Sequence, residues 1–360
     1  MTTFYSLEVK EIRKETADAV SVLLDVPSDL KDKFTFNAGQ HLTFKLESNG
    51  EEIRRSYSIC SSPNGDVLQV AIKRIPGGIF STYATGELKV GNKLEVMPPM
   101  GHFHTEIVPT NKKRYVAFTA GSGITPIMSN ILAILEGEEN SSVCLIYGNK
   151  DYKSIIFKEE IEDLKNRYLG RFEFYHLLSR EPEMPTLFEG RITVDKCKEM
   201  EKVTSLLDAD EYLLCGPEEM ILSVSDWLKQ EGVSKEKIHF ELFVTASQLA
   251  ENGTNIHKER QEIAESEHNA VEIILDGKVF NFNMGDGIDN ILDGAMEAGA
   301  DAPFACKGGV CCTCRAKVLE GEVKMDVNFA LTEEEVNQGF VLTCQAYPVS
   351  KKVKIDFDHI

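Results

Sequence analysis

The chain of 360 residues contains no run of about 20 consecutive apolar residues, the length that a membrane-spanning helix needs. The longest candidate, residues 115–135, is interrupted by Gly and Ser at 121–123 and by Pro126. No membrane span or membrane partner is therefore expected. The first residues, MTTFYSLEVKEI, also lack the basic start and apolar stretch of a signal peptide, so we expect a cytoplasmic location.

Positive charge is scarce: 39 Lys and Arg residues stand against 58 Asp and Glu, which gives a net charge of −19. A nucleic-acid-binding protein needs a basic face, so nucleic acid is not an expected partner. An acidic surface is compatible with a positively charged protein partner, although it more often serves solubility alone.

Internal repeats and low-complexity tracts are absent, and disulfides are not expected, because cytosolic thiols stay reduced. The nine cysteines are unevenly distributed. Those at 60, 144, 197 and 215 are scattered, whereas five fall between positions 306 and 344. This clustering points to a shared chemical role in the C-terminal region.

The first part of the chain, residues 1–108, has the pattern of short β-strands. Apolar or alternating segments at 20–26, 40–46, 67–74 and 93–98 are separated by Gly, Pro, Asn and Asp. Strands at this spacing predict a small antiparallel β-barrel.

From about Arg114 the pattern changes, and residues 109–246 predict an α/β domain. The apolar strands YVAFTA, SVCLIYG, FEFYHLLS and EYLLCG alternate with helical segments. This alternation indicates a doubly wound parallel sheet. Residues 247–269 are polar and charged, so we expect a linker there. Residues 270–360 begin with a predicted hairpin, VEIILDGKVFNF, and form a third domain.

The C-terminal domain contains the string CKGGVCCTC. Cys306, Cys311 and Cys314 give the spacing C-x4-C-x2-C, and Cys344 follows in VLTCQAYP. This is the plant-type ferredoxin spacing, in which four thiolates hold a [2Fe–2S] cluster. A zinc site would more often show paired C-x2-C modules, and inert buried cysteines would not cluster in this way. Cys312 is expected to pack beside the loop as a non-ligand.

A second motif is AGSGITP, which follows the strand YVAFTA. Gly121 and Gly123 form a turn, with Thr125 and Pro126 expected as the N-cap and first residue of a helix. A phosphate at such a helix start meets free N–H groups and the positive end of the helix dipole. The motif predicts nucleotide binding, with an ordinary tight turn as the alternative.

Two further strand ends carry candidate residues. Ser179 and Arg180 follow FEFYHLL and are placed to hold a ribose 2′-phosphate, but a surface arginine near a turn explains them equally well on local grounds. Cys215, in LCGP, is placed to contact a nicotinamide ring, or is a small buried residue.

The segments RRSYSICSSP and GGIFSTY offer what a flavin requires, namely an aromatic face, a hydroxyl group, a cation and free N–H groups. Tyr57, Ser58, Arg55 and the Gly77–Gly78 turn supply these groups. Taken alone, RSYS indicates only an edge strand.

In this order, RRSYSICSSP, GGIFS, AGSGITP, LCGP and CKGGVCCTC resemble the ferredoxin–NADP reductase superfamily fused to a C-terminal plant-type ferredoxin, over essentially the full chain. The resemblance implies a multidomain fold: an antiparallel β-barrel for FAD, a doubly wound α/β domain for NADP and a β-grasp ferredoxin domain. Some relatives carry FMN, but GGIFSTY is similar to the FAD-binding members.

The resemblance also implies the site residues. Those for FAD are Arg55, Tyr57, Ser58, Gly77, Gly78, Phe80 and Ser81. Those for the pyridine nucleotide are Gly121, Gly123, Thr125, Pro126, Ser179, Arg180, Cys215, Gly216 and Pro217. The residues expected at the reacting centre are Ser58, Cys215 and Glu241. The expected metal ligands are Cys306, Cys311, Cys314 and Cys344. The SRE element of residues 179–181 favours NADPH as co-substrate.

The implied activity is electron transfer from NADPH through FAD and the cluster to an oxygenase component. The loop ACKGGVCCTCRAKVLEG is similar to that of the reductase subunits of phenylacetyl-CoA epoxidases, which predicts a role in phenylacetate degradation. The alternatives are a reductase for a ring-hydroxylating dioxygenase or a steroid or other monooxygenase, and a non-enzymatic redox sensor.

Overall fold

The computed structural model describes residues 3–181, 185–243, 269–285 and 288–359, which form two compact units, an N-terminal one and a smaller C-terminal one. The linker predicted at 247–269 lies outside the described residues, apart from Asn269. Among the described helices, none has both the length and the apolar character needed to cross a membrane.

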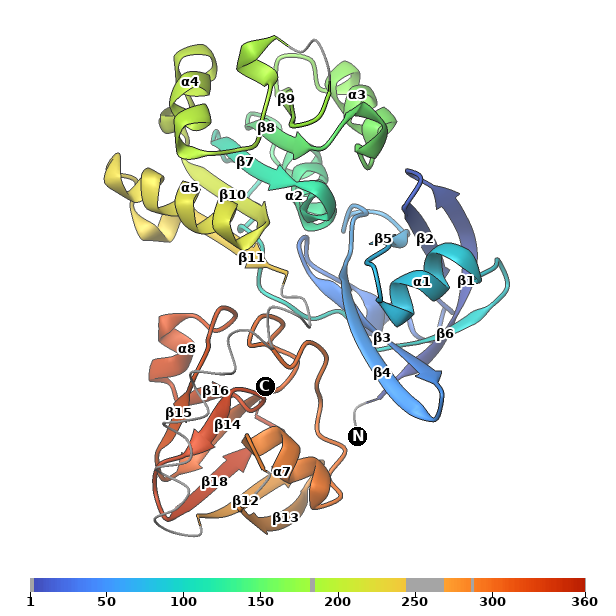
Figure 1. Cartoon of the computed structure of the whole chain (residues 1–360), viewed down its shortest axis with the longest axis vertical. Helices are drawn as coiled ribbons and strands as arrows, with labels where there is room; N and C mark the ends of the chain where they lie inside the picture. Colours follow the sequence, from blue (N-terminus) through green and yellow to red (C-terminus); the bar gives the residue numbers. More distant parts are fainter. Residues whose placement is uncertain (1–2, 182–184, 244–268, 286–287, 360) are drawn as a thin grey trace. The chain divides into compact units, whose positions relative to one another are not determined.

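The N-terminal part of the first unit is an antiparallel barrel (Figure 1). The strand order is β4-β3-β6-β1-β2-β5, and an antiparallel bridge between Ile59, just after β4, and Val70 of β5 joins the two edge strands. The predicted barrel is confirmed. Its elements are β1 (Tyr5–Lys14), β2 (Ala19–Asp25), η1 (Lys31–Phe34), β3 (His41–Ser48), β4 (Glu51–Ser58), β5 (Leu68–Lys73), α1 (Ile79–Gly86) and β6 (Lys93–Val96).

The second part of this unit is a parallel sheet in the order β11-β10-β7-β8-β9. Its strands are β7 (Arg114–Ala120), β8 (Ser142–Asn149), β9 (Phe172–Leu178), β10 (Glu211–Gly216) and β11 (Ile238–Leu242). Its helices are α2 (Ile124–Gly137), α3 (Lys158–Arg167), α4 (Val194–Thr204) and α5 (Glu218–Gln230). Short 3₁₀ turns connect them: η2 (Gly121–Gly123), η3 (Tyr152–Ser154), η4 (Thr186–Phe188), η5 (Leu206–Asp208) and η6 (Lys235–Lys237).

Helices cover both faces of this sheet, as the strand–helix alternation predicts. On one face, Tyr115 and Ala117 of β7 share a core with Ile127 of α2 and Ile161 of α3. Strand side chains alternate between faces, and on the other face Cys144 of β8 lies 3.6 Å from the hydroxyl of Thr204 in α4. The doubly wound fold is therefore confirmed.

The C-terminal unit has a mixed sheet in the order β13-β12-β18-β14-β16, in which β12 and β18 are parallel. The predicted hairpin is confirmed, with Asp276 and Gly277 as its turn. Helix α7 packs on the sheet, which is the β-grasp arrangement. The elements are β12 (Ala270–Leu275), β13 (Lys278–Asn283), α7 (Ile291–Glu297), β14 (Arg315–Glu320), β15 (Val323–Met325), α8 (Glu333–Asn337), β16 (Phe340–Leu342), β17 (Ala346–Pro348) and β18 (Lys352–Asp356).

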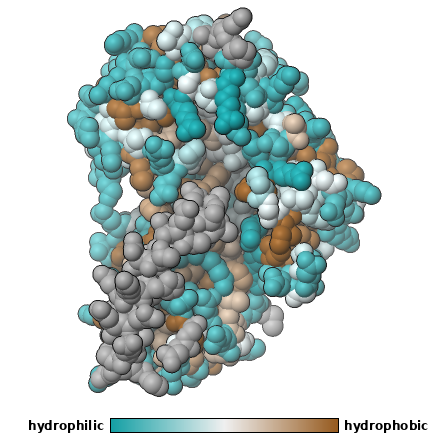
Figure 2. Space-filling view, viewed as in Figure 1, coloured by the Kyte–Doolittle hydropathy of each residue, from teal (hydrophilic) through white to brown (hydrophobic). Residues whose placement is uncertain are grey.

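On the face drawn in Figure 2, hydrophilic side chains cover most of the described surface, and hydrophobic ones form separate patches. Single exposed apolar side chains such as Leu169, which is 81% exposed, are ordinary on the surface of a folded protein.

Candidate functional site

The carboxyl ends of the parallel strands bring several predicted residues together. Cys215 of β10 is in register with Thr119 of β7 on one side and with Glu241 of β11 on the other. The η2 turn lies directly on this edge, because a Cβ added to Gly123 would stand only 2.2 Å from the carbonyl oxygen of Cys215. A glycine is therefore required at position 123.

The helix after this turn begins earlier than the sequence predicts. Thr125 is not the N-cap and Pro126 is not the first helical residue, because α2 starts at Ile124 with Gly123 as its N-cap. The physical reason is the η2 turn: Gly121, at φ +57°, reverses the chain immediately after β7. The hydroxyl of Thr125 donates instead to the carbonyl of Ser122, at 3.0 Å. The carbonyls of Gly121 and Ser122 are therefore both bonded within the fold, the first by the hydroxyl of Tyr147.

A hydrogen bond joins the barrel to this sheet edge. Ser58, at the end of β4, donates its hydroxyl to Oε2 of Glu241 at 3.2 Å. Burial raises the pKa of the Glu241 carboxyl to about 8, although the bond from Ser58 acts in the opposite direction. Burial also raises the pKa of the Cys215 thiol well above its ordinary value, so this thiol is neutral and is not an activated nucleophile.

The aromatic residues of the predicted flavin segment form a layered contact. Tyr57 is half-buried, with its ring centroid 5.4 Å from that of Phe80, which is itself only 1% exposed. Phe80 therefore supports Tyr57 from the core and offers a ligand only its backbone. Arg55 is exposed and precedes Tyr57 by two positions on β4, which places both on one side of the strand.

The loop before α1 is held by Ser81. Its hydroxyl accepts from the N–H of Ile75 at 3.1 Å and lies 3.3 Å from the carbonyl of Gly78, to which it donates. Gly78 is the N-cap of α1 and Gly77 precedes it in a turn. Because the Ser81 side chain is buried in these contacts, the N–H groups at the start of α1 are what this segment presents to an anion.

Ser179 and Arg180 lie immediately after β9, next to the end of β8. The N–H of Ser179 donates to Asn149 O at 3.0 Å, and that of Arg180 to Lys150 O at 2.7 Å. The Arg180 side chain is exposed. Gly216 ends β10 and Pro217 precedes α5, so these two residues lie at the same carboxyl edge.

Four of the five cysteines of the C-terminal unit lie in two pairs of hydrogen-bond partners, Cys306 with Cys311 and Cys314 with Cys344. The hydrogen bond with Cys311 lowers the pKa of Cys306, helped by backbone N–H groups such as that of Gly308, 3.3 Å from its sulfur. Four thiols in two pairs, with N–H groups aimed at sulfur, fit a two-iron cluster. Within the described ranges, no three His, Cys, Asp or Glu side chains are grouped for a single metal ion.

Cys312 differs from these four. It is 5% exposed, belongs to the hydrophobic core of the unit, and its thiol donates to the carbonyl of Ala330 at 3.2 Å. Cys314 and Cys344 belong to the same core, so burial alone does not distinguish Cys312 from the predicted ligands, and its role as a non-ligand stays a prediction.

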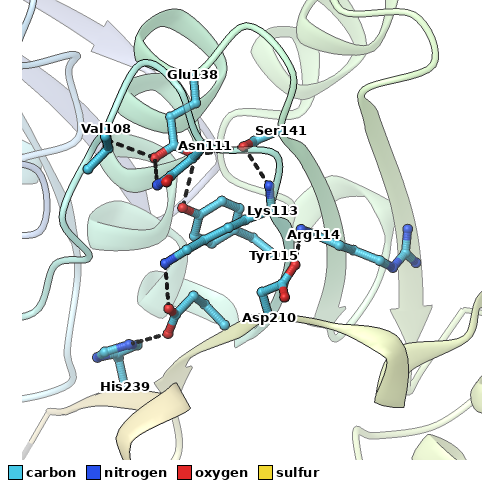
Figure 3. Close-up of polar contacts among 10 residues, drawn as sticks. Val108, Asn111, Lys113, Arg114, Tyr115, Glu138, Ser141, Asp210 and His239 are labelled. Atoms are coloured by element: carbon cyan, nitrogen blue, oxygen red, sulfur yellow. Dashed lines mark hydrogen bonds and ion pairs between the residues drawn. The ribbon is translucent and has the colours of Figure 1, made fainter.

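The opposite, amino-terminal end of the parallel sheet carries a different kind of cluster (Figure 3). Glu138, which is fully buried, follows α2 and accepts four hydrogen bonds. The donors are Val108 N (3.0 Å), Asn111 Nδ2 (2.7 Å), Tyr115 OH (3.0 Å) and Ser141 Oγ (2.7 Å). They fix the segment that leads from the barrel into β7.

Beside it, Lys113 Nζ lies 2.7 Å from Glu211 Oε1, and Glu211 Oε2 lies 3.0 Å from His239 Nε2 (Figure 3). These contacts tie together the starts of β7, β10 and β11. No sequence motif marks them.

One residue at the carboxyl edge was not predicted as a site residue from the sequence. Phe243 directly follows β11, two positions after Glu241, and is 37% exposed. A partly exposed aromatic ring next to a half-buried carboxyl is a signal for a flat ligand, but it becomes visible only once β11 is identified as a strand of this sheet.

Comparisons with known proteins agree with this arrangement. Residues 6–105 match the family described as "Oxidoreductase FAD-binding domain", residues 118–226 match "Oxidoreductase NAD-binding domain", and residues 273–349 match "2Fe-2S iron-sulfur cluster binding domain". The predicted cofactor classes, FAD, a pyridine nucleotide and a [2Fe–2S] cluster, are thereby confirmed.

Two relatives match over nearly the full length. The chain is 39% identical to a subunit of the 1,2-phenylacetyl-CoA epoxidase of Escherichia coli (strain K12), covering 99% of both chains. It is 31% identical to the ferredoxin reductase component of 3-ketosteroid-9-alpha-monooxygenase of Rhodococcus rhodochrous, covering 98% of this chain and 96% of that protein.

Among solved structures, phthalate dioxygenase reductase matches with a TM-score of 0.57 and 21% identity, covering 98% of both chains. An intact type IV self-sufficient cytochrome P450 monooxygenase matches with a TM-score of 0.68 and 20% identity, covering 98% of this chain and 41% of that one. These likenesses support the fold.

Proposed function

Because the chain belongs to the family of oxidoreductases that combine FAD-binding, NAD-binding and 2Fe–2S domains in one reductase component, we propose that it transfers electrons from NADPH to an oxygenase. The family membership is carried by the match to a relative 39% identical over 99% of both chains. The proposed route runs from NADPH to FAD and then to the [2Fe–2S] cluster.

Bound FAD would accept two electrons as hydride and release them one at a time to the cluster, which the protein makes possible by positioning and by excluding water. Tyr57 would offer one ring face to the flavin, with Phe80 supporting its other side. Arg55 and the N–H groups of residues 79–81, at the start of α1, would bind the pyrophosphate.

The main support for the location of this site is the hydrogen bond from Ser58 to Glu241. It brings the end of the flavin strand β4 to the carboxyl edge where Cys215 and Gly123 meet. In open α/β sheets, nucleotides bind at this edge. We therefore assign the nicotinamide to the surroundings of Ser58, Cys215 and Glu241. The phosphates of the nucleotide are assigned to the neighbouring backbone at Gly121, Gly123, Gly216 and Pro217.

For the choice of nucleotide we propose NADPH, on the strength of Arg180. This exposed cation follows β9 at the same edge, where a ribose 2′-phosphate would lie.

Arg180→Ala should raise the KM for NADPH by roughly tenfold, the effect of losing about 1.4 kcal/mol of binding free energy, and leave the KM for NADH within twofold. Steady-state reduction of ferricyanide measures both constants. Arg167→Ala, an exposed arginine on α3, is the control, and an equal rise for both nucleotides would contradict the assignment.

The proposed cluster ligands are Cys306, Cys311, Cys314 and Cys344. Cys306→Ser should remove the visible absorbance of the cluster and most of its iron, while NADPH still reduces the flavin at the normal rate, because the ligands lie outside the flavin and nucleotide domains. Cys312→Ser is the matched control in the same loop and should keep the cluster. Loss of iron in the control and not in Cys306→Ser would reverse the ligand assignment.

For the acceptor we propose the phenylacetyl-CoA epoxidase, because the relative that is 39% identical is a subunit of such an enzyme. Other relatives are named as reductases of 3-ketosteroid and glycine betaine monooxygenases. Reconstitution separates these possibilities: NADPH oxidation should couple to epoxidation of phenylacetyl-CoA by the purified oxygenase subunits. Coupling only to a steroid or betaine oxygenase would reject this acceptor, and NADPH oxidation without any acceptor turnover would favour a redox sensor.

A further inference from the structure

The two residues on either side of Cys344 both contact the loop that contains the other three cysteines. Thr343, Cys344 and Gln345 lie between β16 and β17, in the C-terminal unit. Cys344 is the proposed fourth cluster ligand, and any role of its neighbours toward the cluster rests on that proposed ligand set. Neither neighbour has a side chain suited to bind iron in a sulfur cage.

Thr343 holds the end of the cysteine loop. Its backbone N–H donates to the carbonyl of Cys314 at 3.1 Å, and its hydroxyl donates to the same oxygen at 2.9 Å. The residue is completely buried. A side-chain hydroxyl and a backbone N–H thus share one acceptor, which fixes the last of the three loop cysteines against the strand of the fourth.

Gln345 holds the start of the same loop. Its side-chain Nε2 donates to the carbonyl of Lys307 at 2.9 Å and to that of Cys344 at 3.0 Å, so one amide group bridges the residue after Cys306 and the fourth cysteine itself. The backbone of Gln345 is also fixed, since its N–H donates to Leu342 O at 2.9 Å and its carbonyl accepts from Asp326 N at 3.0 Å.

We propose that Thr343 and Gln345 are positioning residues that clamp both ends of the three-cysteine loop to the fourth cysteine and so determine how firmly the cluster is held. A cluster of fixed size requires four sulfurs at fixed separations. Three of them lie on a loop with glycines at 308 and 309, whose backbone can adopt many shapes unless bonds from outside the loop fix it. Groups that orient ligands without touching the metal commonly change metal affinity by about 10–100-fold.

The test uses substitutions that keep the shape of each side chain. Thr343→Val removes the hydroxyl, and Gln345→Glu replaces the bridging donor by a carboxylate facing two carbonyl oxygens. Both proteins should assemble the cluster, but it should be lost roughly tenfold faster in the presence of a chelator for Gln345→Glu, and by a smaller factor for Thr343→Val, whose backbone bond to Cys314 remains. The readouts are the decay of visible absorbance, the iron and sulfide content, and the midpoint potential.

Two controls separate positioning from general damage. Thr343→Ser keeps the hydroxyl and should restore the normal rate of loss. Gln338→Glu makes the same chemical change at an exposed glutamine just after α8 and should behave as the unmodified protein. If Thr343→Val does not fold, the half-buried Gln345 still allows the test. Unchanged rates and potentials in Thr343→Val and Gln345→Glu would overturn the proposal.

The ligand set is tested separately with Cys344→Ser, which should lack the cluster altogether. If Cys344→Ser keeps a full cluster, the ligand assignment is wrong. If it loses the cluster while Gln345→Glu matches the unmodified protein, the ligands stand and only the clamp is wrong.

Discussion

The two ends of the parallel sheet each carry a buried or half-buried glutamate, and the two are treated very differently by their surroundings. At the amino end, Glu138 receives four hydrogen bonds from both backbone and side chains. At the carboxyl end, the donor that the described residues give to Glu241 is Ser58, and burial raises the pKa of this carboxyl to about 8. Both carboxyl oxygens of Glu138 thus accept two hydrogen bonds each, whereas Glu241 can still accept hydrogen bonds from a ligand.

The difference teaches how to separate a structural polar cluster from a functional one. A buried carboxylate with a full set of donors stabilises the fold and has nothing left to offer a ligand. Burial raises the pKa of the other carboxyl, which lies beside a thiol and a glycine turn. Such an arrangement costs folding free energy, and it is typical of a site that a ligand completes. Substitutions at each end of the sheet can test whether this distinction between Glu138 and Glu241 holds.

The largest effect is expected at the amino end. Glu138→Ala would leave the buried hydroxyls of Tyr115 and Ser141 and the amide of Asn111 without their acceptor, at about 1–3 kcal/mol for each unsatisfied group. Since such costs are not additive, we expect a loss of about 3–5 kcal/mol of unfolding free energy, measured by denaturant unfolding. Glu139→Ala changes the adjacent exposed glutamate and should cost less than about 0.5 kcal/mol, as is typical of surface sites.

Equal unfolding free energies of Glu138→Ala and Glu139→Ala would contradict the structural role of Glu138. A raised KM for NADPH in Glu138→Ala protein that remains folded would contradict it as well, because a purely structural network should not contribute to nucleotide binding.

A smaller effect, on activity, is expected at the carboxyl end from Gly123→Ala. The new Cβ would overlap the Cys215 carbonyl oxygen, 2.2 Å away, and would push the η2 turn off the strand edge. An overpacked contact costs about 1–3 kcal/mol, and a cost of this size on nucleotide binding corresponds to a fall of roughly 5–150-fold in kcat/KM for NADPH. Gly86→Ala is the matched control, since no atom lies within 4 Å of a Cβ there. Activity equal to that of the control would show that the turn can move without consequence.

The outline of both ends could be predicted from the sequence, because strand periodicity and a glycine turn are local signals. Strand β11 was not predicted from the residue pattern, since IHFEL is short and contains two polar residues. Helix α4 was also missed, because VDKCKEMEKVT is mostly charged and has few apolar residues to mark a buried face. The N-cap prediction at Thr125 failed because the 3₁₀ turn that begins at Gly121 moves the helix start to Ile124.

The chemistry of the two ends could not be predicted from local pattern. Glu138 stands beside Glu136 and Glu139 in LEGEEN, and nothing in that string distinguishes the buried glutamate from its two exposed neighbours. Ser58 and Glu241 are 183 positions apart, so their hydrogen bond exists only in the folded chain. Glu241 was named through family resemblance, whereas the cluster cysteines were predicted from spacing, because three of them lie in one loop.

The smallest and most specific effect concerns the pH dependence that Glu241 should impose. With a pKa of about 8, its carboxyl is neutral at pH 7 and ionised at pH 9. In the proposed site the negative charge would stand beside the nicotinamide, which becomes a cation as hydride leaves it. A stabilisation of about 1 kcal/mol corresponds to a roughly fivefold faster reduction of the flavin by NADPH at pH 9 than at pH 7. Stopped-flow absorbance measures this rate.

Two variants sharpen this expectation. Glu241→Gln should lose the inflection near pH 8, and Ser58→Ala should move it upward, because the Ser58 hydrogen bond lowers this pKa. Stability gives an independent check of the sign: the folded state keeps a proton that the unfolded carboxyl releases above about pH 4.3, so stability should fall as pH rises toward 8, and not in Glu241→Gln. A pH profile that is the same in both variants as in the unmodified protein would mean that Glu241, like Glu138, is only a structural residue.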